Sequence, residues 1–325
     1  MSLIDRSISQ VEPRCAQRGE IELHLELRHG GVAAITLRYE LIGKGERLVI
    51  AGGGISAGRH VLASAEFPDA GWWDAQAPSF DGCRVLAIDW IGADGALDRP
   101  IDAADQADAI ALLLDHLRIE AADAFIGASY GGMVALQFAA RHPSLCRAIL
   151  AISAAGTSHP FAAACRSLQR RAIALGETSG NPAAGVALAR AMAMLTYRTP
   201  AEFGERFASP PRIDAGRVWV GADDYLDHHG RRHAERMSSA AYRRLSESID
   251  LHGIDPAGIR LPVTFVAVDS DALVPKEDVQ ELAATIPSAR FQLISSVFGH
   301  DAFLKEEGQI AAIITDFLQS LETKP

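Results

Sequence analysis

Cysteine and basic charge are both sparse in this sequence. Its 325 residues include only four cysteines, scattered along the chain without a C-x-x-C pair. A disulfide framework is therefore not indicated, and free thiols in a reducing cytosol are expected. Acidic residues outnumber basic ones by 41 to 31, which gives a net charge of −10. Such a balance disfavours nonspecific binding to nucleic acid.

The sequence also lacks long apolar segments. No uninterrupted apolar run is long enough to span a bilayer, and the first residues, Met1–Arg6, show no basic-then-apolar signal pattern. We therefore expect a soluble, cytoplasmic protein without a membrane partner. With 48% hydrophobic and 22% charged residues, the chain can bury a sizeable core, as one large α/β domain with an insertion or as two smaller domains.

The most informative stretch is residues 123–143. A short apolar run at 124–126 is followed by GASYG at 127–131, which fits G-x-S-x-G, and then by an amphipathic segment. Strand, tight turn and helix form the context in which this motif is a nucleophile elbow, and small residues let the strand and helix approach each other. The motif predicts Ser129 as the nucleophile. The alternative is a glycine-rich turn with an incidental serine.

Strands alternate with helices on both sides of this elbow. Residues 21–28 and 32–40 alternate apolar and polar side chains, which predicts an antiparallel hairpin. Buried strands are predicted at 48–51, 85–88, 124–126, 148–152, 263–268 and 291–294, and helices at 102–118 and 310–321. The alternation indicates a mainly parallel sheet.

This alternation stops between about residues 156 and 256, where the sequence is helical in pattern and rich in alanine and arginine. We interpret residues 157–258 as an inserted helical lid, which holds 13 of the 27 arginines. The predicted fold is an α/β-hydrolase fold, with a mainly parallel eight-stranded sheet built from residues 1–156 and 259–325.

A serine at its ordinary pKa is a weak nucleophile, so a base and an orienting acid are expected elsewhere. In this fold they follow in the order Ser, Asp or Glu, His. The acid should follow the strand after the lid, where Asp269 and Asp271 are both available. We favour Asp271 because it lies further into the loop, while Asp269 suits the turn itself. His300 is the histidine with the right order and loop position, so it is the predicted base.

The oxyanion hole of this fold takes one N–H from the residue after the nucleophile, here Tyr130, and one from a glycine-rich loop after an early strand. Residues 52–55, GGGI, are placed for the second N–H. A loose G-x-G-x-x-A at 52–57 offers a dinucleotide-binding alternative, but no acidic residue at a strand end lies about 20 residues further on.

The segment DHHGRRH at 227–233 raises the question of a metal site. Its histidines have no carboxylate or thiolate partner at a recognised ligand spacing. We therefore expect a solvated face of the lid and no metal.

Several motifs in the lid and near the C-terminus are typical of one family. They lie at residues 188–198, 202–207, 225–227, 249–252, 270–275 and 299–304, together with the GWW block at 71–73 and the elbow at 127–133. These motifs resemble those of the homoserine O-acyltransferases of methionine biosynthesis. The resemblance covers the chain from about Leu48 to Leu304.

The resemblance implies ping-pong acyl transfer from acetyl-CoA or succinyl-CoA to the hydroxyl of L-homoserine, with no bound cofactor, in a homodimer assembled through the lid helices. Carried over by position, it makes Ser129, Asp271 and His300 the catalytic triad. It also places the N–H groups of Ile55 and Tyr130 at the oxyanion hole. The residues that it assigns to homoserine are Arg190, Tyr197 and Asp301.

The chemistry of these residues is compatible with that assignment. Arg190 and Tyr197 are seven residues apart, so both can face one pocket. A guanidinium suits the carboxylate of an amino acid, and Asp301 suits its ammonium. Arg59, four residues beyond Ile55, is a candidate for binding the carboxylate of a succinyl group, the alternative being that it points to solvent or pairs with a lid carboxylate.

Three questions stay open at this stage. The sequence does not choose between acetyl and succinyl donors. The acceptor can instead be water, which would make the protein an esterase, or another hydroxy amino acid such as serine. A non-enzymatic ligand receptor is the remaining alternative, because the fold alone does not choose a function.

Overall fold

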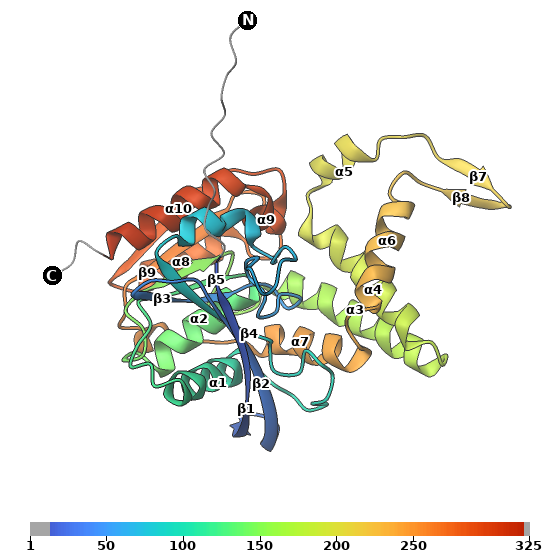
Figure 1. Cartoon of the computed structure of the whole chain (residues 1–325). Coiled ribbons are helices and arrows are strands. Elements are labelled where there is room, and N and C mark those ends of the chain that lie inside the picture. Colours follow the sequence, from blue (N-terminus) through green and yellow to red (C-terminus); the bar gives the residue numbers. More distant parts are fainter. Residues whose placement is uncertain (1–13, 322–325) are drawn as a thin grey trace, which may run out of the picture.

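The computed structural model describes residues 14–321 (Figure 1). The expectation about a signal peptide depends on Met1–Arg6, which lies outside the described residues. Eight strands form one sheet in the order β1-β2-β4-β3-β5-β6-β9-β10. Their bounds are β1 Ala16–Leu27, β2 Gly31–Ile42, β3 Arg47–Gly52, β4 Cys83–Ile88, β5 Ala124–Ala128, β6 Ile149–Ile152, β9 Val263–Val268 and β10 Ala289–Ile294. Within this eight-stranded sheet of the described residues, β1–β2 and β2–β4 pair antiparallel and the other neighbours pair parallel. The predicted α/β-hydrolase sheet is confirmed.

The central strands are buried on both faces, and alternate residues feed two separate cores. In β3, Leu48 and Ile50 belong to one core, while Val49 and Ala51 belong to the other. Because side chains alternate along a strand, such double burial requires helices on both faces. The first core contains side chains of α1 (Ala103–His116), α2 (Tyr130–Arg141) and α8 (Lys276–Thr285), and the second those of η1 (Asp74–Phe80) and α10 (Glu307–Ser320).

The lid lies between β6 and β9 and projects to one side of the sheet (Figure 1). Its helices are α3 Pro160–Thr178, α4 Pro182–Tyr197, α5 Pro200–Arg206, α6 Asp223–Ala234 and α7 Ser239–Leu251. The first three begin with proline directly after a capping residue, a position where the missing N–H costs nothing. The exact domain boundaries stay a prediction.

The lid also contains a short hairpin that the sequence analysis did not predict. Strand β7 (Arg212–Asp214) pairs antiparallel with β8 (Arg217–Trp219). The two linking residues, Ala215 and Gly216, both have positive φ, as a type I′ turn requires. Alanine is unusual at such a position, so the usual turn signal is missing from the sequence.

Within residues 14–321, no helix is both long and apolar enough to cross a membrane.

Candidate active site

Ser129 sits at the tight turn between β5 and α2 with φ 55° and ψ −120°, a strained conformation for a residue with a side chain. Two glycines make the turn possible. A Cβ on Gly127 would lie 2.2 Å from the Gly131 carbonyl oxygen, and one on Gly131 would lie 2.1 Å from that of Gly52. The G-x-S-x-G motif therefore forms the elbow geometry that the sequence predicts.

Ser129, His300 and Asp271 form one hydrogen-bonded chain. Ser129 Oγ lies 2.7 Å from His300 Nε2, and His300 Nδ1 lies 2.7 Å from Asp271 Oδ2. The other carboxylate oxygen of Asp271 accepts hydrogen bonds from the backbone N–H groups of Leu273 and Val274, at 2.9 and 3.0 Å. These two bonds orient the carboxylate toward the imidazole, which is the arrangement of a serine nucleophile with its base and orienting acid.

Opposing effects act on the pKa of His300. Burial lowers it, because a charged imidazole is poorly solvated there, but the negative charge of Asp271, its hydrogen bond and the charge of Asp301 outweigh burial. The net pKa of His300 is raised above its ordinary value. A raised pKa lets the imidazole accept a proton more readily from the serine hydroxyl.

The structure separates the two candidate acids. Asp269 accepts hydrogen bonds from the Ser295 hydroxyl at 2.7 Å and the Ser296 N–H at 3.1 Å, so it connects β9 to the loop after β10. It makes no contact with His300 among those that the structure gives for residues 14–321. Asp271, by contrast, is 5% exposed and reaches the imidazole.

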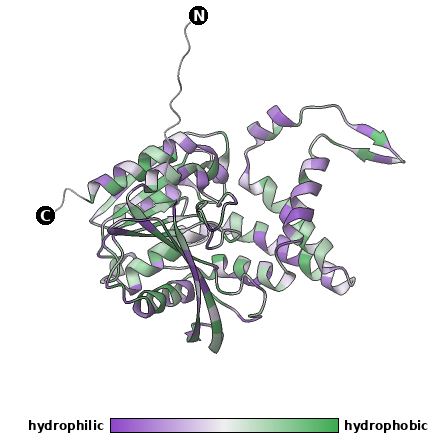
Figure 2. Cartoon of the chain, viewed as in Figure 1, coloured by the Kyte–Doolittle hydropathy of each residue, from purple (hydrophilic) through white to green (hydrophobic). Residues whose placement is uncertain are grey.

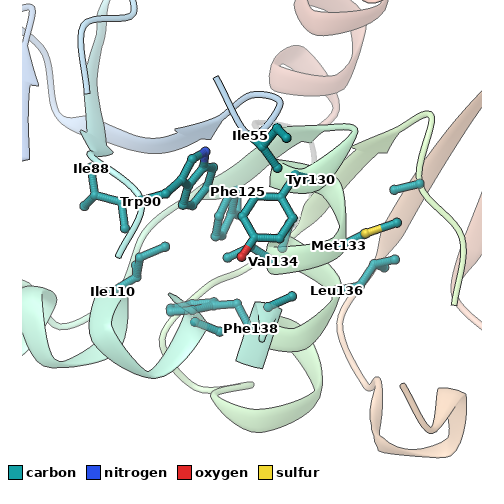
Figure 3. Packing of buried hydrophobic residues seen from close by; sticks show 14 of the residues in the cluster. Ile55, Ile88, Trp90, Ile110, Phe125, Tyr130, Met133, Val134, Leu136 and Phe138 are labelled. Carbon is teal, nitrogen blue, oxygen red and sulfur yellow. The ribbon is translucent and has the colours of Figure 1, made fainter. Parts of the chain in front are cut away.

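The glycine-rich loop after β3 is held against the elbow by Trp90. The Trp90 indole N–H donates to the Gly54 carbonyl at 3.0 Å, and its ring meets that of Tyr130 edge-on at 5.2 Å (Figure 3). Ile55 and Tyr130 both line the cavity at Ser129. In the described part of the chain, no backbone hydrogen bond is recorded for either N–H. Both donors are thus available to an oxyanion.

The side chain of Tyr130 points away from this cavity. It is 1% exposed, and its hydroxyl lies 2.6 Å from the Ser248 hydroxyl of α7 in the lid. Tyr130 therefore connects the elbow to the lid. Burial raises the pKa of Tyr130 well above its ordinary value.

The three residues that the resemblance assigns to homoserine line the same cavity as Ser129 and His300. The Arg190 guanidinium lies 5.2 Å from the centre of the Tyr197 ring, and this ring lies 6.0 Å from that of His300. Among residues 14–321, no hydrogen bond or ion pair is recorded for Arg190. Partial burial of the Asp301 side chain, which is 14% exposed, raises the pKa of its carboxyl, although the charge of Arg198 opposes that effect.

A second guanidinium in this cavity was missed by the sequence analysis. Arg166 of α3 lines it and lies 2.7 Å from the Asp250 carboxylate, which Arg170 also contacts at 2.7 Å. Two arginines thus share one acid, so this wall of the cavity has a net positive charge. Asp250 lies in the motif at residues 249–252, which is the one sequence signal that could have drawn attention to this group. Nothing in the sequence, however, pairs Asp250 with an arginine of α3.

The structure does not bring Arg59 to this cavity. Its backbone N–H donates to Asp89 at 2.9 Å, and its Nε lies 3.7 Å from the same carboxylate. Arg59 is not among the described residues that line the cavity of Ser129. It pairs with a carboxylate of the core, whereas the alternatives expected from the sequence were solvent or a lid carboxylate.

The histidines of α6 differ in their exposure. His228 is exposed, as expected of a solvated face, but the expectation fails for His233, whose Nε2 is buried without a hydrogen-bond partner. Within the described residues, no group of three His, Cys, Asp or Glu side chains is placed to hold a metal ion.

Comparisons with known proteins give the family and the fold of the chain. The sequence profile of the alpha/beta hydrolase fold matches residues 49–307. The homoserine O-succinyltransferase of Xanthomonas campestris is 50% identical over 312 residues, which cover 94% of this chain and 85% of that protein. The homoserine O-acetyltransferase of Thermus thermophilus is 38% identical over 232 residues, 67% of this chain and 58% of that protein.

Solved structures give the same fold. The crystal structure of homoserine O-acetyltransferase from Bacillus anthracis superposes with a TM-score of 0.83, covering 95% of this chain and 98% of that one. Its sequence is 15% identical, so this likeness concerns the fold alone. The sequence relatives are similar enough over enough of their length to assign the family. The chain belongs to the homoserine O-acyltransferases, enzymes with the α/β-hydrolase fold.

Proposed function

We propose that this enzyme transfers an acyl group from acyl-CoA to the hydroxyl of L-homoserine. One observation supports this above the others: the cavity of Ser129 holds a guanidinium, Arg190, and a carboxylate, Asp301, beside the base His300. An α-amino acid carries one carboxylate and one ammonium, which complement these two charges. The arrangement would present the side-chain hydroxyl of the acceptor to His300.

The first half-reaction acylates the enzyme. His300 Nε2 takes the proton of the Ser129 hydroxyl as Oγ attacks the thioester carbon. The N–H groups of Ile55 and Tyr130 stabilise the resulting oxyanion. The C–S bond then breaks, CoA leaves with the proton from His300, and the acyl group remains as an ester on Ser129.

The second half-reaction transfers the acyl group. Homoserine enters after CoA has left, with its carboxylate on Arg190 and its ammonium on Asp301. His300 takes the proton of its hydroxyl, whose oxygen attacks the acyl ester carbon. The ester bond to Ser129 breaks, and His300 returns the proton to Oγ, which restores the free enzyme.

For the donor we propose succinyl-CoA. The 50% identical relative is a homoserine O-succinyltransferase, and the cavity offers a second guanidinium, Arg166, in addition to Arg190. Succinyl transfer to homoserine brings two carboxylates into one site, and each needs a cation. Arg59, the candidate from the sequence, is engaged with Asp89 instead.

We further propose a homodimer assembled through α3 and α4. Apolar side chains at seven-residue spacing are exposed along these helices, at Phe161, Leu168 and Leu175 and at Leu188 and Leu195, each with more than half of its surface accessible. Such a stripe is typical of a helix–helix interface. A cytoplasmic location, in keeping with the four free cysteines, stays a prediction.

CoA release with and without acceptor tests the proposed reaction. Wild-type protein should release CoA from succinyl-CoA in one stoichiometric burst, then turn over only when homoserine is added. Serine in place of homoserine tests the other hydroxy amino acid. Steady release without an acceptor would identify a hydrolase instead. Arg190→Lys should reduce turnover with homoserine far more than the burst, because lysine keeps the charge but loses the planar fork.

A further inference from the structure

A second pocket lies beside the active-site cavity. Its core side is the loop at residues 55–58, and its lid side is α6 with the residues that follow it, including Arg232, His233 and Arg236. Ile55, Ser56, Ala57 and Arg190 line both the pocket and the cavity of Ser129. The two pockets are therefore adjacent at these four residues. Figure 2 shows α6 as strongly hydrophilic.

This pocket, which we call the basic pocket, carries positive charge without partners. Eight of the thirteen lid arginines form ion pairs with acidic residues of the described chain. The five with no recorded ion pair are Arg171, Arg190, Arg217, Arg232 and Arg236. Three of these five line the basic pocket. Its one lining carboxylate, Asp89, is already held by Arg59.

Two histidines that line the basic pocket, His229 and His233, have lowered pKa values. Burial, followed by the charges of Arg190 and Arg236, lowers the pKa of His233 to about 3. The pKa of His229 is also lowered, by burial first and then by the charge of Arg190. Both rings are therefore neutral at pH 7, and the buried Nε2 of His233 has no partner in the described chain. The pocket combines guanidinium groups with neutral imidazoles, a set of groups suited to phosphate oxygens.

We propose that the basic pocket binds the phosphate groups of the acyl-CoA donor, with the pantetheine arm lying along residues 55–57 and the thioester at Ser129. The inference rests on the proposed acyl-CoA chemistry and adds the place where the nucleotide end binds. CoA carries three phosphate groups, which need several cations. In a ping-pong reaction CoA leaves before homoserine binds, so Arg190 can contact each substrate in turn.

Thioesters with and without phosphates test this assignment. Arg232→Gln and Arg236→Gln should each raise KM for succinyl-CoA by about five- to tenfold, with kcat nearly unchanged. With succinyl-pantetheine, which lacks the phosphates, both variants should match wild type within about twofold. Arg231→Gln is the matched control, since its side chain is 71% exposed and outside the pocket lining. It should match wild type with both thioesters.

Equal losses with both thioesters, or no loss with either, would overturn the inference. Calorimetric titration of CoA into Ser129→Ala protein separates this inference from the proposed reaction, because it requires no turnover. CoA affinity that depends on Arg232 and Arg236 supports the pocket even if no acyl group reaches homoserine. Transfer to homoserine with unchanged CoA affinity in both variants, or no CoA binding by Ser129→Ala protein, refutes the pocket.

Discussion

The Nε of Arg198 lies 2.8 Å from the carboxylate of Asp301. Arg198 is itself held by Glu202, at 2.7 Å, and both side chains of that pair are buried. The carboxylate that we assign to the homoserine ammonium is thus positioned from the lid, at the junction of α4 and α5. The lid and the core therefore build the proposed acceptor site together.

Arg198→Gln should raise KM for homoserine by about five- to tenfold, because Asp301 loses the group that positions it. The burst of CoA release, which needs no acceptor, should stay within about twofold of wild type. Arg206→Gln is the matched control, since Arg206 also pairs with Glu202, at 2.8 Å, but is 43% exposed. A burst that falls as far as homoserine transfer would make the Arg198–Asp301 pair structural only.

Asp271→Asn should reduce kcat by about 10⁴-fold, because an amide cannot hold His300 in the required tautomer. Asp269→Asn, two residues away, should cost less than about tenfold, since the Asp269 carboxylate is hydrogen-bonded to Ser295 and Ser296 and, within the described residues, not to His300. Steady-state kinetics of both purified variants, with circular dichroism to verify folding, make the comparison. The opposite order would reassign the orienting acid.

The pH profile of kcat/KM for succinyl-CoA should have an acid limb governed by His300. The base must be neutral to accept a proton, so activity falls as pH drops through its pKa. Because that pKa is raised, the midpoint should lie above the ordinary value of 6.5. Asp301→Asn removes one of the charges that raise it and should move the limb to lower pH, while Asp269→Asn should leave it in place. An unmoved limb in Asp301→Asn would exclude this electrostatic contribution.

Arg166→Gln should lower kcat/KM for succinyl-CoA by about ten- to 100-fold and leave acetyl-CoA within about threefold, since acetyl has no terminal carboxylate. Arg170→Gln serves as the control, because Arg170 is the other partner of Asp250 but does not line the cavity. Parallel kinetics with both CoA esters give the preference directly. If Arg166→Gln kept the wild-type preference, Arg166 would not bind the succinyl carboxylate.

Leu168→Glu and Leu175→Glu should convert a dimer to monomers, because each places a charge in the exposed apolar stripe of α3. Analytical ultracentrifugation at several concentrations measures the change. Leu112→Glu, at an exposed site on α1, is the control and should leave the dimer intact. A monomeric wild-type protein would contradict the proposed assembly.

Much of the fold is determined by local sequence. Alternating apolar residues predicted the first two strands of the large sheet, and short apolar runs predicted the others, because a strand buried on one face has a period of two and a strand buried on both faces is apolar throughout. The elbow at Ser129 was equally predictable, since only small residues fit where β5, α2 and the Gly52 loop meet. The order of nucleophile, acid and base along the chain then indicated Asp271 and His300.

Only the tertiary structure decided which charges meet. Arg59 lies near Ile55 in the sequence, but its side chain pairs with Asp89. Arg166, from helix α3 of the lid, lines the cavity instead. The pairs Arg166–Asp250 and Arg198–Asp301 join residues 84 and 103 positions apart. Ion pairing depends on the distance between two charged groups in space and on how deeply they are buried. Neither quantity follows a repeating pattern along the sequence. The sequence alone therefore determined the catalytic order, and folding determined the basic pocket and the charges around the substrates.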